Sequence, residues 1–223
     1  MDDPLANLPA SVFSNAIEEA KALGAAASEI GRDKFLFFKK GIYIDSNKEQ
    51  VPLGTEYLAQ CIGWQYCWIR FNDGAAPTRH MFNAPLVKAG KLNMPRRNAL
   101  GDDDQTKWGP GLDGKPRDPW IFQHYLPFFD EEDRLVVFCT GSALGGQIAV
   151  GELCKVAAQR TERTGVTAHP RIKLGSATFP SAKWGKVQRP MFEIVGWTDL
   201  VEGIRTFVPP DTLKDEMNDE IPF

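Results

Sequence analysis

Short apolar runs alternate with turn residues through the middle of the chain. The runs cover residues 35–38, 41–44, 55–62 and 64–71, and polar clusters at 45–48 and 72–74 separate them. Runs of this length between turn clusters predict β-strands. Residues 120–139 predict two more strands around an acidic turn at 130–133, and residues 170–174 and 191–197 predict closing strands.

Two other segments space their apolar residues as a helix does. Residues 10–31 predict a weakly amphipathic helix, and residues 147–160 predict a second helix. Residues 74–119 contain six prolines, which interrupt any regular element. A long segment without regular structure is usually functional or disordered, and the basic and aromatic residues of this one favour a function.

The composition is that of an ordinary globular protein: of the 223 residues, 43% are hydrophobic and 25% are charged. No run approaches the roughly 18 to 20 apolar residues of a membrane span, and the acidic N-terminus lacks the features of a signal peptide. We therefore expect a cytoplasmic protein with no membrane partner. The four cysteines (61, 67, 139 and 154) and three histidines match no metal motif, although a zinc site built from distant positions stays open.

The net charge of −3 hides an asymmetry along the chain. Residues 211–223 carry five acids and one base, so residues 1–210 have a net charge of +1. Residues 153–192 carry eight bases and one acid, Glu162, with Glu152 just outside. A basic segment of this kind is suited to nucleic-acid phosphates.

The chain ends in five residues with a distinctive pattern: Asp219, Glu220, Ile221, Pro222 and Phe223. Such an end can place Phe223 in an apolar pocket while its terminal carboxylate meets a basic residue. It closely resembles the C-terminal tip of bacterial single-stranded DNA-binding proteins, which ends in acids followed by Ile-Pro-Phe. The resemblance implies recruitment of replication and recombination proteins. A solvated acidic tail ending in Phe by chance is the alternative.

The body of the chain resembles a family of phage-encoded proteins. The resemblance rests on Lys40-Gly41, Gly54-Thr55, Gly145-Gly146, and the segments 117–120 and 185–197. It supports a phage origin, and therefore a bacterial host cytoplasm, more than a particular activity.

Pattern and resemblance together predict a mainly β fold. We expect a five-stranded β barrel of the OB-fold type with long loop insertions and one or two helices. Residues 1–208 would form a single elaborated domain, and Pro209-Pro210 would begin a disordered acidic interaction tail, residues 209–223. Another small barrel or a sandwich would give the same sequence signals.

The segment 64–71 is the strongest candidate for contact with bases. In a strand, alternation places Trp64, Tyr66, Trp68 and Arg70 on one face and Cys67, Ile69 and Phe71 on the other. Aromatic rings in a row stack on nucleic-acid bases at about 1–3 kcal/mol per base. The alternative is that these rings are core, with Arg70 at the rim.

The remaining candidate DNA-binding residues are cations and aromatics elsewhere in the body. The loop around 183–186 mixes charge with an aromatic ring, and Gly141 to Gln147 could add a phosphate contact, although a plain strand-to-helix turn is the better interpretation. The candidates are Lys39, Lys40, Tyr43, Arg96, Arg97, Trp108, Arg117, Trp120, Arg171, Lys173, Lys183, Trp184, Lys186 and Arg189.

We therefore expect a single-stranded DNA-binding protein of phage replication or recombination, with no catalytic residue, metal site or cofactor. Self-association into a homo-oligomer is left open. One alternative is a metal-dependent nuclease built on Asp102, Asp103 and Asp104, with partners among Asp118, Asp130 and Asp133. Another is a protein-interaction module that mimics the host tip without binding DNA.

Overall fold

The structure is a computed structural model that describes residues 35–72, 75–111, 114–181, 185–201 and 204–208. The predicted helix at 10–31, the loop residues 183 and 184 and the acidic tail at 209–223 lie outside the described residues.

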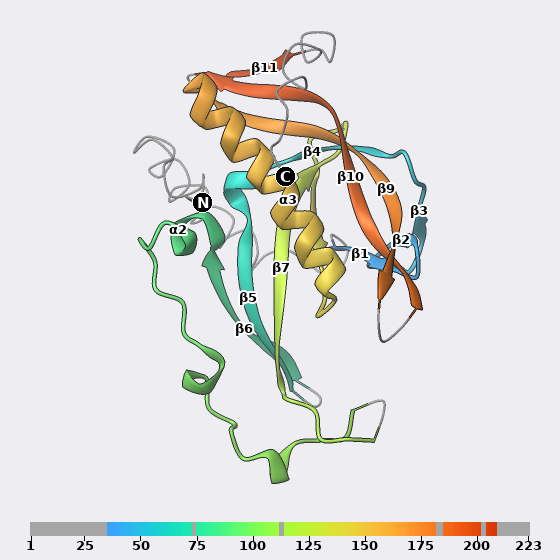
Figure 1. Cartoon of the computed structure of the whole chain (residues 1–223), viewed down its shortest axis with the longest axis vertical. Helices are drawn as coiled ribbons and strands as arrows, with labels where there is room; N and C mark the ends of the chain where they lie inside the picture. Colours follow the sequence, from blue (N-terminus) through green and yellow to red (C-terminus); the bar gives the residue numbers. More distant parts are fainter. Residues whose placement is uncertain (1–34, 73–74, 112–113, 182–184, 202–203, 209–223) are drawn as a thin grey trace.

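The described chain is mainly β (Figure 1). One eleven-stranded sheet has the order β11-β10-β9-β4-β7-β8-β1-β2-β3, and β5 pairs with both β7 and β6. All pairs are antiparallel except β1 with β8. The strands are β1 (Phe35–Lys39), β2 (Ile42–Asp45), β3 (Gln50–Val51), β4 (Glu56–Ala59), β5 (Gln65–Asn72), β6 (Ala75–Asn83), β7 (Trp120–Phe129), β8 (Leu135–Cys139), β9 (Thr167–Ser181), β10 (Gly185–Val201) and β11 (Ile204–Val208).

The sheet curls into a half-barrel, which confirms the expected mainly β, barrel-like class. Tyr43 in β2 is fully buried, and its hydroxyl donates to the carbonyl oxygen of Gly175 in β9 at 2.9 Å. The same hydroxyl lies 3.3 Å from the Met191 carbonyl in β10. These contacts join strands that are distant in the sheet order. The sheet has more strands than the simple five-stranded barrel because long hairpins extend it.

Helix α3 (Leu144–Thr164) packs across one face of this curled sheet (Figure 1). Its buried residues Val150, Leu153 and Ala157 join a core that includes Phe128 and Ile172 of the sheet. Burial of such side chains contributes roughly 25 cal/mol per Å² of apolar surface. The predicted helix at 147–160 is confirmed and is longer at both ends, and Gly165 closes it in the left-handed conformation.

Strands β5, β6 and β7 extend beyond the core as a three-stranded arm (Figure 1). Strand β6 and the short helix α2 (Ala84–Lys88) lie in the segment that was expected to be irregular. The edge position of β6 tolerates Pro77, which would disrupt a central strand. Helix α2 begins where the Asn83 side chain accepts a hydrogen bond from the Leu86 amide, and Pro85 occupies its first turn.

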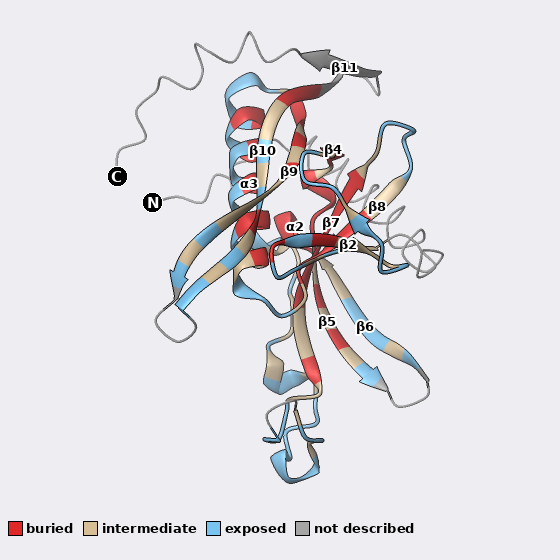
Figure 2. Ribbon diagram, turned by 90° about the vertical axis from the view of Figure 1, so that its right-hand side faces the viewer, coloured by how far each residue is buried: buried red, intermediate tan, exposed pale blue. Residues whose placement is uncertain are grey.

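A long connection, residues 89–119, leads from α2 to β7, and we call it the strap. It contains two short 3₁₀ turns, Arg97–Ala99 and Gln105–Lys107. Much of the strap and of the β6 edge is exposed, whereas the buried residues concentrate near α3 (Figure 2). In the part of the chain that the structure describes, no helix has the length and apolar character needed to cross a membrane.

Candidate nucleic-acid interface

One face of the arm carries a block of aromatic and polar residues that we call the aromatic face. Antiparallel register places three residues of β5 opposite residues of β6 and β7, with all side chains on the same side. The three rows are Phe82, Tyr66 and His124; then His80, Trp68 and Phe122; then Thr78, Arg70 and Trp120. The predicted alternation of β5 is therefore observed.

The rings of this face form a continuous series of contacts. Phe122 lies 5.0 Å from Trp68 and 5.4 Å from Tyr66, measured between ring centroids. Tyr66 lies 4.9 Å from His124 and 5.1 Å from Trp64. Tyr66, Trp68 and Phe122 are half-buried, so each residue keeps some solvent-accessible surface. Such tilted ring contacts hold each ring in a fixed orientation.

Three predicted contact residues have interior rings, which rules out base stacking by these rings. Trp64 has 1% of its surface exposed and belongs to the main core, as the core interpretation of this strand proposed. Tyr43 is fully buried, and burial raises the pKa of its hydroxyl. Trp120 is 6% exposed because it lies against His80 and beneath the strap. None of the three rings can reach a base in this arrangement.

The apolar surroundings at the inner end of the aromatic face shift the pKa of His124. His124 is buried among the rings of Trp64, Tyr66 and Phe122. Loss of solvation, followed by the nearby positive charge of Lys88, lowers the pKa of His124 to about 4. The imidazole is therefore neutral at pH 7.

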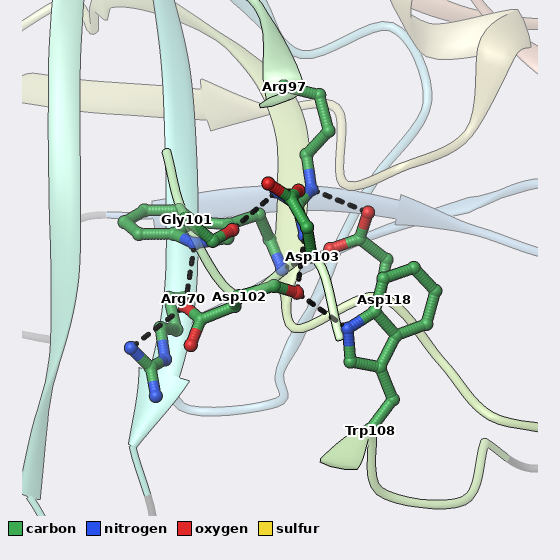
Figure 3. A network of polar contacts seen from close by, with 8 residues as sticks. Arg70, Arg97, Gly101, Asp102, Asp103, Trp108 and Asp118 are labelled. Carbon is green, nitrogen blue, oxygen red and sulfur yellow. Dashed lines mark hydrogen bonds and ion pairs between the residues drawn. The ribbon is translucent and has the colours of Figure 1, made fainter. Parts of the chain in front are cut away.

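The strap docks onto the aromatic face through indole N–H groups and one ion pair (Figure 3). The Trp68 indole donates to the Pro95 carbonyl oxygen at 3.2 Å. The same carboxylate oxygen of Asp102, Oδ2, lies 3.0 Å from Arg70 Nη1 and 3.0 Å from Trp120 Nε1. Strap oxygens thus bind the side-chain N–H groups of Trp68, Arg70 and Trp120 in the outer half of the face.

Arg97 holds the strap in its own conformation rather than facing solvent. Its guanidinium donates to Asp118 at 2.6 Å, to the Gly101 carbonyl at 2.7 Å and to Asp103 at 3.2 Å (Figure 3). The bond to Asp118 raises the pKa of Arg97 further. The Trp108 indole donates to the Asp102 carbonyl at 2.7 Å. Arg97 and Trp108, both predicted DNA contacts, thus have their polar groups engaged in bonds within the strap.

The acidic residues of the nuclease alternative pair with basic and polar side chains and do not form a metal site. Asp102 binds Arg70, Asp103 binds Arg97, and Asp104 binds Thr106 and Lys107. The hydrogen bond from Thr106, then that from Lys107, lowers the pKa of Asp104. Among the described residues, no three His, Cys, Asp or Glu side chains are grouped so as to hold a metal ion, which also applies to the zinc alternative.

A second group of candidates lies at the tip of the β9–β10 hairpin. A Cβ atom at Gly41 would meet the side chain of Gln188, so the turn between β1 and β2 lies against β10. This brings Lys39 and Lys40 close to the strand that carries Lys186. All three lysines are exposed and form no ion pair within the described ranges. We call these three lysines the basic tip.

The other predicted cations differ in whether an acidic side chain lies close to them. Arg189 pairs with Glu152 at 3.0 Å, while Arg171 and Lys173 face Glu56 at 3.9 and 3.4 Å. Each of these three predicted contact residues therefore already lies near an acidic side chain. Two further candidates on the strap, Arg96 and Arg117, are exposed. Lys183 and Trp184 lie outside the described residues.

The start of α3 connects the aromatic face to the β9–β10 hairpin. Gln147 Nε2 lies 3.5 Å from the Phe122 carbonyl oxygen, while a Cβ at Gly145 would lie 2.9 Å from Arg189 Cβ. A Cβ at Gly146 would lie 3.1 Å from Thr140 Cβ. These glycines permit close packing, which agrees with a plain strand-to-helix turn.

Phe122 was missed in the sequence, and Asp102 was considered there only as a possible metal ligand. Phe122 lies at the centre of the ring contacts, and the alternation of Trp120, Phe122 and His124 could have indicated it. No local pattern could have indicated the ion pair between Asp102 and Arg70, because the two residues are 32 positions apart in the sequence.

Comparison of this chain with protein-family models, curated proteins and solved structures finds no significant match.

Proposed function

We propose that this protein binds single-stranded DNA and acts in phage DNA replication or recombination. The observation that carries the proposal is the half-buried row of Tyr66, Trp68 and Phe122 beside Arg70 on one face of the arm. Aromatic faces of this kind stack on unpaired bases and tolerate any sequence, because every base has a π-face.

The basic tip supplies the second part of the proposed interaction. Lys39, Lys40 and Lys186 are exposed, and each would neutralise a backbone phosphate. The β9–β10 and β5–β6 hairpins both point toward the lower end of the molecule as drawn in Figures 1 and 2. A flexible single strand could contact both hairpins, whereas bases in a duplex are stacked on each other.

The acidic end of the chain carries the proposed recruitment of other proteins. The pattern from Asp219 to Phe223 resembles the tip of bacterial single-stranded DNA-binding proteins. Deletion of residues 211–223 should leave or raise the affinity for DNA and abolish recruitment of replication and recombination proteins. A loss of DNA affinity would contradict this division between body and tail.

The direct test is fluorescence anisotropy of labelled oligo(dT) and of a labelled duplex, each titrated at two salt concentrations. We expect tighter binding of oligo(dT) than of the duplex, and weaker binding at higher salt. A protein that gives no salt-sensitive shift with oligo(dT), but binds a host partner through its tip, would instead be an interaction module. Metal-dependent cleavage of the oligonucleotide would favour the nuclease.

A further inference from the structure

The ion pair between Arg70 and Asp102 is the best-defined polar feature of the aromatic face. Arg70 extends from the arm beside the rings, whereas Asp102 belongs to the strap. The carboxylate oxygen that meets the guanidinium also accepts the indole N–H of Trp120. Two donors from neighbouring strands therefore converge on a single anionic oxygen.

From this convergence we propose that Arg70 and the Trp120 N–H form a subsite for a backbone phosphate of single-stranded DNA, and that Asp102 occupies this subsite in the free protein. The inference rests on the proposed function and adds a named phosphate position to it. A phosphodiester carries the same single negative charge as a carboxylate, and its oxygens accept hydrogen bonds from the same donors. The exchange would leave no buried charge without a partner.

The position of the pair makes such an exchange accessible. The Arg70 side chain is 42% exposed and that of Asp102 is 31% exposed, so solvent and ions reach both. An ion pair at this exposure favours the state in which Asp102 binds Arg70 by a factor of about five at most. A cavity of about 350 Å³ lies beside the pair. Lys107 and Trp108 line it, and so do the carboxylates of Asp103 and Asp104, which pair with Arg97 and Lys107. This volume falls within the range of small-ligand sites.

The backbone of the strap is arranged to present this carboxylate. Asp102 has a φ of +58°, in the left-handed region that Asp and Asn adopt more readily than most residues. The carbonyl oxygen of Asp102 accepts from Trp108 and Arg97, at 2.7 and 3.2 Å, which fixes the residue (Figure 3). Asparagine keeps this backbone preference without the charge, so Asp102→Asn removes the competitor and retains the turn.

The test compares full-length wild type, Asp102→Asn and Asp103→Asn in anisotropy titrations with labelled oligo(dT) over a series of salt concentrations. Both substitutions change the net charge equally, but the carboxylate of Asp103 meets Arg97, which retains Asp118. We expect Asp102→Asn to raise the affinity roughly fivefold. Asp103→Asn should behave as wild type.

Two further measurements separate the subsite from a general charge effect. In an Arg70→Gln background, Asp102→Asn should give no gain, because no guanidinium remains to be freed. Hydrogen exchange of residues 96–108 should become faster when oligo(dT) binds to wild type, because the strap loses its contact with Arg70. Slower exchange on binding would overturn the displacement.

Equal effects of Asp102→Asn and Asp103→Asn, or weaker binding by Asp102→Asn, would overturn the inference. The proposed function would still stand in that case, provided that wild type binds oligo(dT). If wild type and all variants fail to bind oligo(dT), the proposed function itself fails, and the subsite fails with it.

Discussion

The indole ring of Trp68 lies against the ring of Phe122, directly across the β5–β7 pair, with 5.0 Å between their centroids. Phe122 thereby braces Trp68 from the side, while the strap carbonyl of Pro95 holds the indole N–H. An aromatic ring fixed in this way can stack on a base without first losing much conformational freedom.

Replacement of Trp68 should therefore weaken binding of a single strand. We expect Trp68→Ala to lower the affinity for oligo(dT) by about 1–3 kcal/mol, the usual loss for one stacked base. The matched control is Phe71→Ala, because Phe71 belongs to the same strand, lies outside the three rows of the aromatic face and is 60% exposed. Anisotropy titrations measure both variants, and equal losses would refute a specific role for the aromatic face.

Removal of one lysine from the basic tip should reduce the salt dependence of binding. Lys186→Gln is expected to make the slope of log affinity against log salt shallower by roughly 0.7, since one phosphate contact is lost. Lys48→Gln is the control: Lys48 is also exposed but lies beyond the other end of β2 from Lys40. Identical slopes for the two variants would show that only net charge matters.

Two glycines of α3 should respond in opposite directions to the same substitution. Gly145→Ala should destabilise the fold by about 1–3 kcal/mol, because its new Cβ would lie 2.9 Å from Arg189 Cβ and separate the helix from β10. Gly151→Ala meets no atom within 4 Å and should stabilise the helix by up to about 1 kcal/mol. Urea unfolding of both variants measures this, and destabilisation of equal size would contradict the packing described at Gly145.

His124 should make the stability depend on pH. Its pKa is about 4 in the folded protein and near 6.5 in the unfolded chain, so the unfolded state binds the proton more tightly. The stabilisation is fully present above pH 6.5 and is lost as the pH falls toward 4, by roughly 3 kcal/mol at most. Urea unfolding at several pH values should show this slope in wild type and a smaller one in His124→Phe. Superimposable pH curves would show that His124 is not the source.

The local patterns of the sequence predicted most of the β architecture. The turn at 130–133 between β7 and β8 and the alternation of β5 follow from neighbouring residues, so they are readable without the fold. Strand β6 was missed because Pro77 and Pro85 suggested an irregular loop. Pro77 is tolerated at a sheet edge, and Pro85 begins a helix.

The division of the aromatic strand between core and surface could not be predicted from alternation. Trp64 and Trp68 share one face, yet Trp64 is interior and Trp68 is half-buried, because the arm leaves the core between them. Likewise, the ion pairs between Arg97 and Asp118 and between Asp102 and Arg70 depend on how the strap folds back. Contacts of this kind are set by tertiary structure rather than by residue spacing.

The central claim is that the half-buried rings of the aromatic face stack on unpaired bases while lysines and arginines meet phosphates. Intrinsic tryptophan fluorescence during titration with poly(dT), at low and at high salt, tests both parts together. The account predicts quenching that saturates, that needs more poly(dT) at high salt, and that is largely lost in Trp68→Ala. Fluorescence that does not change with poly(dT), or quenching that Trp68→Ala leaves intact, would contradict it.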